Sequence, residues 1–110
     1  MYKIEGTTIS MVRGDTLVAA ISLNRGGEPY IPTANDTIRF AVKRQYGDLQ
    51  PCIQKEVPTD TMELKLNPSD TAKLPFGTYI YDLEIEFEDG AIDTFVAGGM
   101  LNILNEVCSA

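Results

Sequence analysis

The chain has 110 residues, of which 44% are hydrophobic and 23% are charged, and its formal net charge is -7. This composition is typical of one soluble globular domain that is large enough to bury a core without disulfide bonds. The acidic balance argues against nucleic acid and anionic membranes as partners, because binding to either depends on Lys and Arg.

Alternating apolar residues predict a series of short strands in the first two thirds of the chain. A long loop is expected over residues 24–36, because residues 24–32 hold two glycines and two prolines. Pro51 suits an edge strand or the start of a strand. The expected strands are residues 2–5, 7–12, 16–23, 37–44, 50–57 and 61–66.

The longest alternating strand follows a predicted helical turn over residues 70–74, which Ser69 or Asp70 can cap and Pro75 ends. A period of two held from residue 79 to residue 87 predicts one buried face and one solvated face. The predicted buried face is Tyr79, Tyr81, Leu83, Ile85 and Phe87, and the predicted solvated face is Asp82, Glu84, Glu86 and Glu88.

The C-terminal part of the chain is expected to form a hairpin and a last strand. Residues 88–90 are a hairpin turn signal, and residues 91–97 are the partner strand. Gly98 and Gly99 permit a bend or bulge before a final strand over residues 100–107. One domain is therefore expected over residues 1–107, with a tail over residues 108–110.

Seven or eight short strands with one helical turn predict an all-β fold, an immunoglobulin-like antiparallel β-sandwich. In that layout a tyrosine near the corner that follows the helical turn hydrogen-bonds to the backbone. Tyr79 is predicted to have this role, with Tyr81 as the second choice.

The acidic face of the long strand has two interpretations. It could hold Ca²⁺ or a general acid/base pair, but carboxylates two residues apart on a strand point in parallel and do not converge. We therefore favour a solvated face whose charges meet Arg39, Lys43 or Arg44 across a neighbouring strand. A second possible calcium loop, formed by Glu86, Asp89 and Asp93, lacks the alternating Asp/Asn pattern of such loops.

The sequence lacks histidine, which removes Ser–His and Cys–His catalysis and nearly every zinc site. We expect no catalytic residues, no cofactor and no metal. Residues 13–15 spell Arg-Gly-Asp, an integrin-recognition tripeptide, but they also suit a plain turn, which we favour.

Residues 1–15 contain no continuous apolar segment, so no signal peptide is predicted, and no run approaches the ~18 apolar residues of a membrane span. We expect the chain to be made and kept in a cytoplasm, where Cys52 and Cys108 would be free thiols. Tyr30, Tyr46 and Phe76 lie in or beside loops. They either form a patch that contacts sugar or protein, or cap the ends of the sandwich, which we favour.

One distinctive run is Asp-Thr-Ala-x-Leu-Pro-x-Gly-x-Tyr-x-Tyr-Asp, at residues 70–82. It lies within a set of segments between residues 11 and 103: Val12-Arg-Gly-Asp-Thr-Leu17, Asp36-Thr-Ile-Arg-Phe-Ala-Val-Lys43, Ile53-Gln-Lys55, Leu66-Asn-Pro-Ser-Asp-Thr-Ala-Lys-Leu-Pro-Phe-Gly-Thr-Tyr-Ile-Tyr-Asp-Leu83, Asp89-Gly90 and Thr94-Phe95. These segments resemble small proteins of phages and prophages of gut bacteria, and are similar to the immunoglobulin-like N-terminal domain of phage upper-baseplate proteins.

This resemblance implies a structural protein without catalytic residues. We expect a non-enzymatic structural or assembly module of a phage particle, whether in the baseplate, the tail or the head. Its expected partners are other phage structural proteins and further copies of itself, since edge strands can pair with another chain. In that case the chain would be made in a bacterial cytoplasm and would reside in the virion after assembly. The alternative is a sandwich module that binds carbohydrate or a host surface through its loops.

Overall fold

Strands form nearly all of the regular structure in the computed structural model, which describes residues 2–105. One helical turn, α1 (Pro68–Thr71), lies between β8 and β9. The strands in the described part of the chain are β1 (Tyr2–Glu5), β2 (Thr8–Val12), β3 (Leu17–Ala20), β4 (Leu23–Arg25), β5 (Glu28–Tyr30), β6 (Thr37–Lys43), β7 (Ile53–Val57), β8 (Glu63–Leu66), β9 (Gly77–Glu86) and β10 (Ile92–Leu104).

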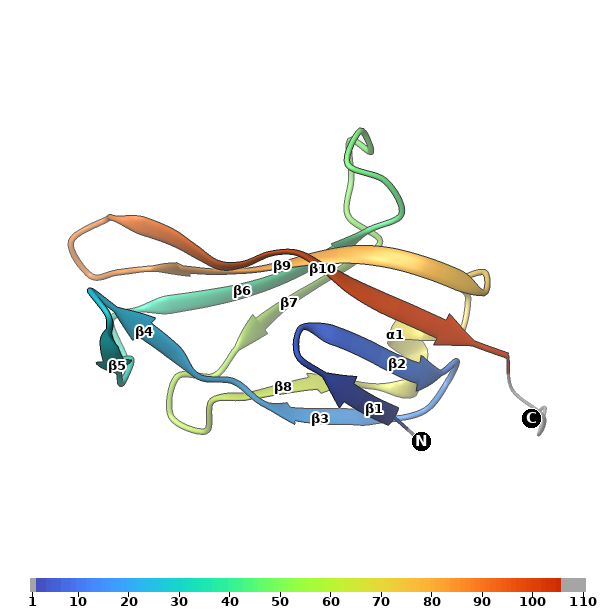
Figure 1. Ribbon diagram of the computed structural model, residues 1–110, viewed down its shortest axis with the longest axis horizontal. Coiled ribbons are helices and arrows are strands. Elements are labelled where there is room, and N and C mark those ends of the chain that lie inside the picture. Colours follow the sequence, from blue (N-terminus) through green and yellow to red (C-terminus); the bar gives the residue numbers. More distant parts are fainter. Residues whose placement is uncertain (1, 106–110) are drawn as a thin grey trace.

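The strands form two layers, as Figure 1 shows. One layer is a six-stranded sheet in the order β1-β2-β10-β9-β6-β7, and the other is the β3–β8 pair. A third, small sheet pairs β4 with β5. This architecture confirms the predicted all-β sandwich. All neighbouring strands are antiparallel except β2 and β10, which run parallel, a pairing that the sequence analysis did not predict.

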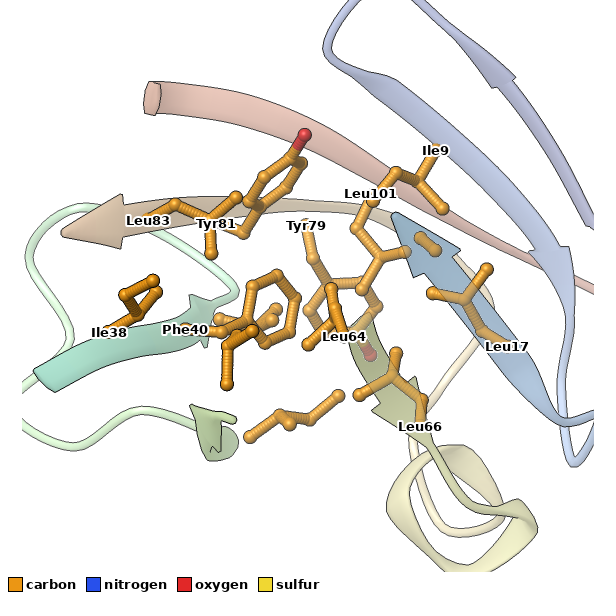
Figure 2. Close-up of a cluster of buried hydrophobic side chains, with 14 of the residues drawn as sticks. Ile9, Leu17, Ile38, Phe40, Leu64, Leu66, Tyr79, Tyr81, Leu83 and Leu101 are labelled. Atoms are coloured by element: carbon orange, nitrogen blue, oxygen red, sulfur yellow. The ribbon is translucent and has the colours of Figure 1, made fainter. Parts of the chain in front are cut away.

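The core lies between the two layers and is built on the predicted apolar face of β9. Figure 2 shows how side chains from β2, β3, β6, β8, β9 and β10 gather there. Every residue predicted on that face is buried, from Tyr79 to Phe87. The same alternation buries Ile38, Phe40 and Val42 of β6. The period of two therefore identified the buried face correctly in both central strands.

The corner between α1 and β9 has the predicted tyrosine. The hydroxyl of Tyr79 donates to the carbonyl oxygen of Pro75 at 2.7 Å, four residues upstream. The helical turn begins two residues earlier than predicted, because Pro68 suits the first helical position and Asn67 precedes it as the N-cap. Asp70 completes a capping box with Asn67, because its carboxylate accepts a hydrogen bond from the Asn67 backbone amide at 2.6 Å. The N-cap is therefore Asn67 and not Ser69 or Asp70, although Asp70 takes part in capping the turn through this bond.

Other boundaries also differ from the prediction: β7 begins at Ile53 and β8 at Glu63, where strands were expected from residues 50 and 61. The strand expected over residues 16–23 is divided into β3 and β4, and the loop expected after it contains the β4–β5 hairpin. Gly26 and Gly27 form its turn, with φ of 62° and 82°, as tight hairpin turns require. The two strands expected over residues 91–107 are one long strand, β10, whose irregular register accommodates Gly98 and Gly99.

No helix among residues 2–105 is long and apolar enough to cross a membrane. The predicted tail over residues 108–110, Cys108, and the end of the predicted last strand at residues 106–107 lie outside the described residues.

Candidate functional site

The acidic face of β9 is held by a single arginine from the neighbouring strand. Arg39 donates from Nη1 to Oε1 of Glu84 at 3.0 Å and from Nη2 to Oε1 of Glu86 at 2.8 Å. These bonds, that to Glu86 first, raise the pKa of the Arg39 guanidinium above its ordinary value. Asp82 instead accepts a hydrogen bond from the Gly98 amide at 2.7 Å. The predicted cross-strand pairing is confirmed for Arg39, which Glu84 and Glu86 share, whereas Asp82 bonds to the backbone of β10.

The carboxylates at the β9–β10 hairpin also bond to groups of the protein itself. Oδ1 of Asp89 accepts a hydrogen bond from the Ala91 amide at 3.0 Å, and Oδ2 lies 3.7 Å from the Arg25 guanidinium. Glu86 is engaged with Arg39. Within residues 2–105, no group of three or more His, Cys, Asp or Glu side chains is placed to hold a metal ion.

The Arg-Gly-Asp segment forms the predicted turn and is fastened to the corner between α1 and β9. The Asp15 amide donates to the Val12 carbonyl at 3.1 Å. The Gly14 amide donates to Oγ1 of Thr71, a buried side chain, at 2.8 Å. The Arg13 guanidinium lies 4.2 Å from the centre of the Phe76 ring. These contacts give the tripeptide a structural role in joining the β2–β3 turn to the corner.

Asp36 is the most connected carboxylate in the described structure, and the sequence analysis did not single it out. Its Oδ2 accepts hydrogen bonds from the Tyr30 hydroxyl at 2.6 Å and the Thr33 amide at 2.9 Å. Its Oδ1 accepts one from the Glu88 amide at 3.0 Å. The residue is only 6% exposed. The Tyr30 hydroxyl, followed by the Thr33 amide, lowers the pKa of Asp36, and the same bond raises the pKa of Tyr30.

An aromatic cluster closes the end of the sandwich beside Asp36. The Tyr30 and Phe87 rings meet edge to face, with centroids 5.3 Å apart. The Arg25 guanidinium covers the Phe87 ring at 3.7 Å. A hollow of about 300 Å³ opens among these side chains. Tyr30 therefore caps an end of the sandwich, as predicted.

The three loop aromatics do not form one patch. Tyr30 packs on Phe87, just after the last residue of β9, whereas Phe76 directly precedes its first residue. The two rings thus belong to opposite ends of a ten-residue strand. Tyr46 lies in the β6–β7 loop and is 73% exposed. A binding surface that uses all three rings, one of the two interpretations of the sequence, is therefore wrong.

The most prominent exposed feature is the β6–β7 loop, residues 44–52, which stands off the six-stranded sheet on the side away from β3 and β8 (Figure 1). The Asp48 carboxylate accepts hydrogen bonds from the amides of Arg44 and Gln45, each at 3.1 Å. At the base of the loop, the Cys52 amide donates to the Val42 carbonyl at 2.8 Å. The loop is therefore an ordered projection.

Cys52 is a free thiol among the described residues, as predicted. The residue is exposed, its Sγ lies 3.3 Å from the Val42 carbonyl oxygen, and partial desolvation of the sulfur raises the pKa of the thiol. A raised pKa disfavours the thiolate that a nucleophile or a metal ligand needs.

A small hollow lies beside this projection on the same face of the sheet. It has a volume of about 100 Å³ and is lined by Ala41, Lys43, Tyr46, Ile80, Tyr81 and Asp82. Drug-sized and cofactor ligands occupy pockets of ~300–1,000 Å³, so this hollow suits a single side chain better than a free ligand. Searches with the whole chain find no matching protein-family model, curated protein or solved structure.

Proposed function

We propose that this chain is a non-enzymatic structural or assembly module of a phage or prophage particle. The observation that carries the proposal is the place of the distinctive run at residues 70–82 in the fold. This run begins within α1, continues through the corner and leads into β9, and it includes the Tyr79 hydrogen bond to Pro75. The run on which we base the resemblance thus forms a corner of the sandwich, which supports a structural role.

The use of the polar groups supports the same proposal. Arg39, Asp36 and Arg13 each join elements that are distant in sequence. Within residues 2–105, no buried side-chain nitrogen or oxygen lacks a hydrogen-bond partner. Catalytic sites usually leave a polar group poised for substrate, whereas satisfied groups of this kind stabilise a rigid module.

The test is the composition of particles from a bacterium that carries this gene in a prophage. Particles are induced, purified on a density gradient and analysed by quantitative mass spectrometry. We expect the chain to co-purify with the major capsid and tail proteins, at a fixed ratio across the particle fractions. An abundant cytoplasmic protein of similar mass serves as the control for carry-over. A chain that follows this control, and not the capsid, would contradict the proposal.

The second candidate is a module that binds carbohydrate or a host surface, and the exposure of Tyr46 favours it. A solvent-facing aromatic ring beside a hollow can stack on a sugar. Tyr46 is such a ring, and of the three loop aromatics it is the most exposed. A glycan array probed with the wild-type chain and with Tyr46→Ala decides the matter. Binding that is absent, or that is the same for both proteins, removes this candidate.

A further inference from the structure

One end of the sandwich holds an arginine whose position is fixed but whose hydrogen-bond donors are unused by the protein. Cζ of Arg25 lies 3.7 Å from the centre of the Phe87 ring, and its Nη2 lies 3.7 Å from Oδ2 of Asp89. The second distance exceeds the ~3.2 Å of an N–H···O hydrogen bond. In the part of the chain that the structure describes, this guanidinium donates no hydrogen bond to a protein acceptor. Its planar fork of N–H groups is therefore oriented and available to a ligand.

This guanidinium borders the hollow of about 300 Å³ between the β4–β5 hairpin and the β9–β10 turn, which lie at the same end of the sandwich (Figure 1). Leu23 pairs with Tyr30 in the hairpin, and Arg25 lies two residues after Leu23, so Arg25 and Tyr30 share one face of it. The half-buried Tyr30 ring also lines the hollow, and its hydroxyl bond to Asp36 holds it in place. Ligand pockets have volumes of ~300–1,000 Å³, so this hollow suits a small ligand the size of one sugar ring.

The charged residues of the hollow restrict the chemistry of its ligand. Asp36, Glu88 and Asp89 line it together with Arg25, so carboxylates outnumber the cation. An anionic ligand would be repelled by this excess of negative charge. A cationic ligand would meet Arg25, which already covers the Phe87 ring. A ligand that satisfies both the guanidinium and the carboxylates must accept and donate hydrogen bonds without a charge of its own, and hydroxyl groups do both.

We propose that this hollow binds a neutral, hydroxyl-rich ligand, namely a sugar in its pyranose form. The Arg25 fork donates to two neighbouring hydroxyl oxygens of the sugar, and the carboxylates of Glu88 and Asp89 accept hydrogen bonds from its hydroxyl groups. The Tyr30 ring packs against the C–H groups of the sugar ring. This site goes beyond the proposed structural role, and it is distinct from the hollow beside Tyr46.

The experiment is a titration of the isotope-labelled full chain, followed by NMR amide chemical shifts, with the methyl glycosides of glucose, galactose, mannose and N-acetylglucosamine. We expect at least one of these neutral sugars to shift the amides of Arg25, Tyr30 and Asp89, with a Kd of about 1–10 mM, as befits a ligand with so few contacts. Glucuronate and glucosamine place a negative and a positive charge on the same kind of ring. Both are expected to bind more weakly than the neutral sugars.

Arg25→Gln is expected to weaken this binding at least ~10-fold, because it removes charge-assisted hydrogen bonds to the sugar. Arg25→Lys keeps the charge but loses the planar fork, so it should weaken binding as well. The Arg25 side chain is 46% exposed, so both variants should fold, which thermal melts followed by circular dichroism verify.

Tyr46→Ala is the matched control, because Tyr46 is an exposed aromatic residue of the β6–β7 loop and does not line this hollow. This variant is expected to bind like the wild type. The inference is overturned if none of the four neutral sugars shifts the amides at concentrations up to about 100 mM, or if either Arg25 variant binds as tightly as the wild type. Binding that is lost in Tyr46→Ala, or that is tighter for glucosamine than for any neutral sugar, also overturns it. Incorporation into particles tests the structural role separately, because it does not depend on a bound sugar.

Discussion

Asp36 should be the most sensitive polar position in the described structure. Its carboxylate joins β5, the loop before β6 and the β9–β10 hairpin through three hydrogen bonds. Asp36→Asn keeps the shape of the side chain but removes its negative charge. It also turns an NH₂ group toward at least one of the three donors, which then has no acceptor. A hydrogen bond to a charged group contributes ~1.5–3 kcal/mol, and an unpaired buried donor costs ~1–3 kcal/mol.

From these values we expect Asp36→Asn to lower the free energy of unfolding by about 3 kcal/mol at neutral pH, most of it from lost charge and the mismatched donor. For a chain of this length, that loss corresponds to a fall in Tm of about 13 °C. Tyr30→Phe is the graded control. It removes the hydroxyl but leaves the bonds from Thr33 and Glu88 in place, so its cost should be clearly smaller than that of Asp36→Asn.

The pH dependence of the free energy of unfolding tests the same prediction independently. The pKa of Asp36 is lowered in the folded protein, so its stabilising contribution is present above the ordinary Asp pKa of about 4. That contribution is lost as the pH falls through the lowered folded value. Urea unfolding of the wild type and Asp36→Asn should therefore show a gap that is widest at neutral pH and narrows below about pH 4. Two curves that coincide at neutral pH, or a gap that is unchanged in acid, would refute the reasoning.

Two further substitutions test the corner and the acidic face. Tyr79→Phe removes the bond to Pro75 and should lower the free energy of unfolding by about 1 kcal/mol, or the Tm by about 4 °C, in a thermal melt followed by circular dichroism. A Tm equal to that of the wild type would mean that the corner tyrosine serves only as packing. Arg39→Gln should cost about 1 kcal/mol in low salt, measured by urea unfolding, because Glu84 and Glu86 lose a shared and partly exposed partner. That cost should shrink at about 1 M NaCl, and a cost independent of salt would show that the guanidinium acts through contact and not through charge.

The features that could be predicted from the sequence are those with local causes. Alternation identified the buried face of β9, because each side chain of a strand points opposite to its neighbour. Tyr79 could be predicted because its partner, Pro75, is four residues away and the helical turn between two strands marks the corner. The pairing of Arg39 with the acidic face followed from the charges on neighbouring strands, although Lys43 and Arg44 were equally open choices until the register was known.

The features that were missed depend on contacts distant in sequence. Nothing near Asp36 indicates that the Glu88 amide, 52 residues away, completes its set of donors. The parallel pairing of β2 with β10 joins the two ends of the chain and has no signature in either strand. The β4–β5 hairpin is different, because Gly26-Gly27 is itself a tight-turn signal that was interpreted as a loop.

The free strand edges of the six-stranded sheet are poorly suited to the strand addition that we expected from the sequence. At one edge, β7 turns Lys55 toward α1, where its ammonium lies 2.9 Å from the Asp70 carboxylate. At the other edge, β1 has four residues and places Lys3 2.8 Å from Glu5. Short edge strands and inward-turned charges are devices that discourage pairing with another chain.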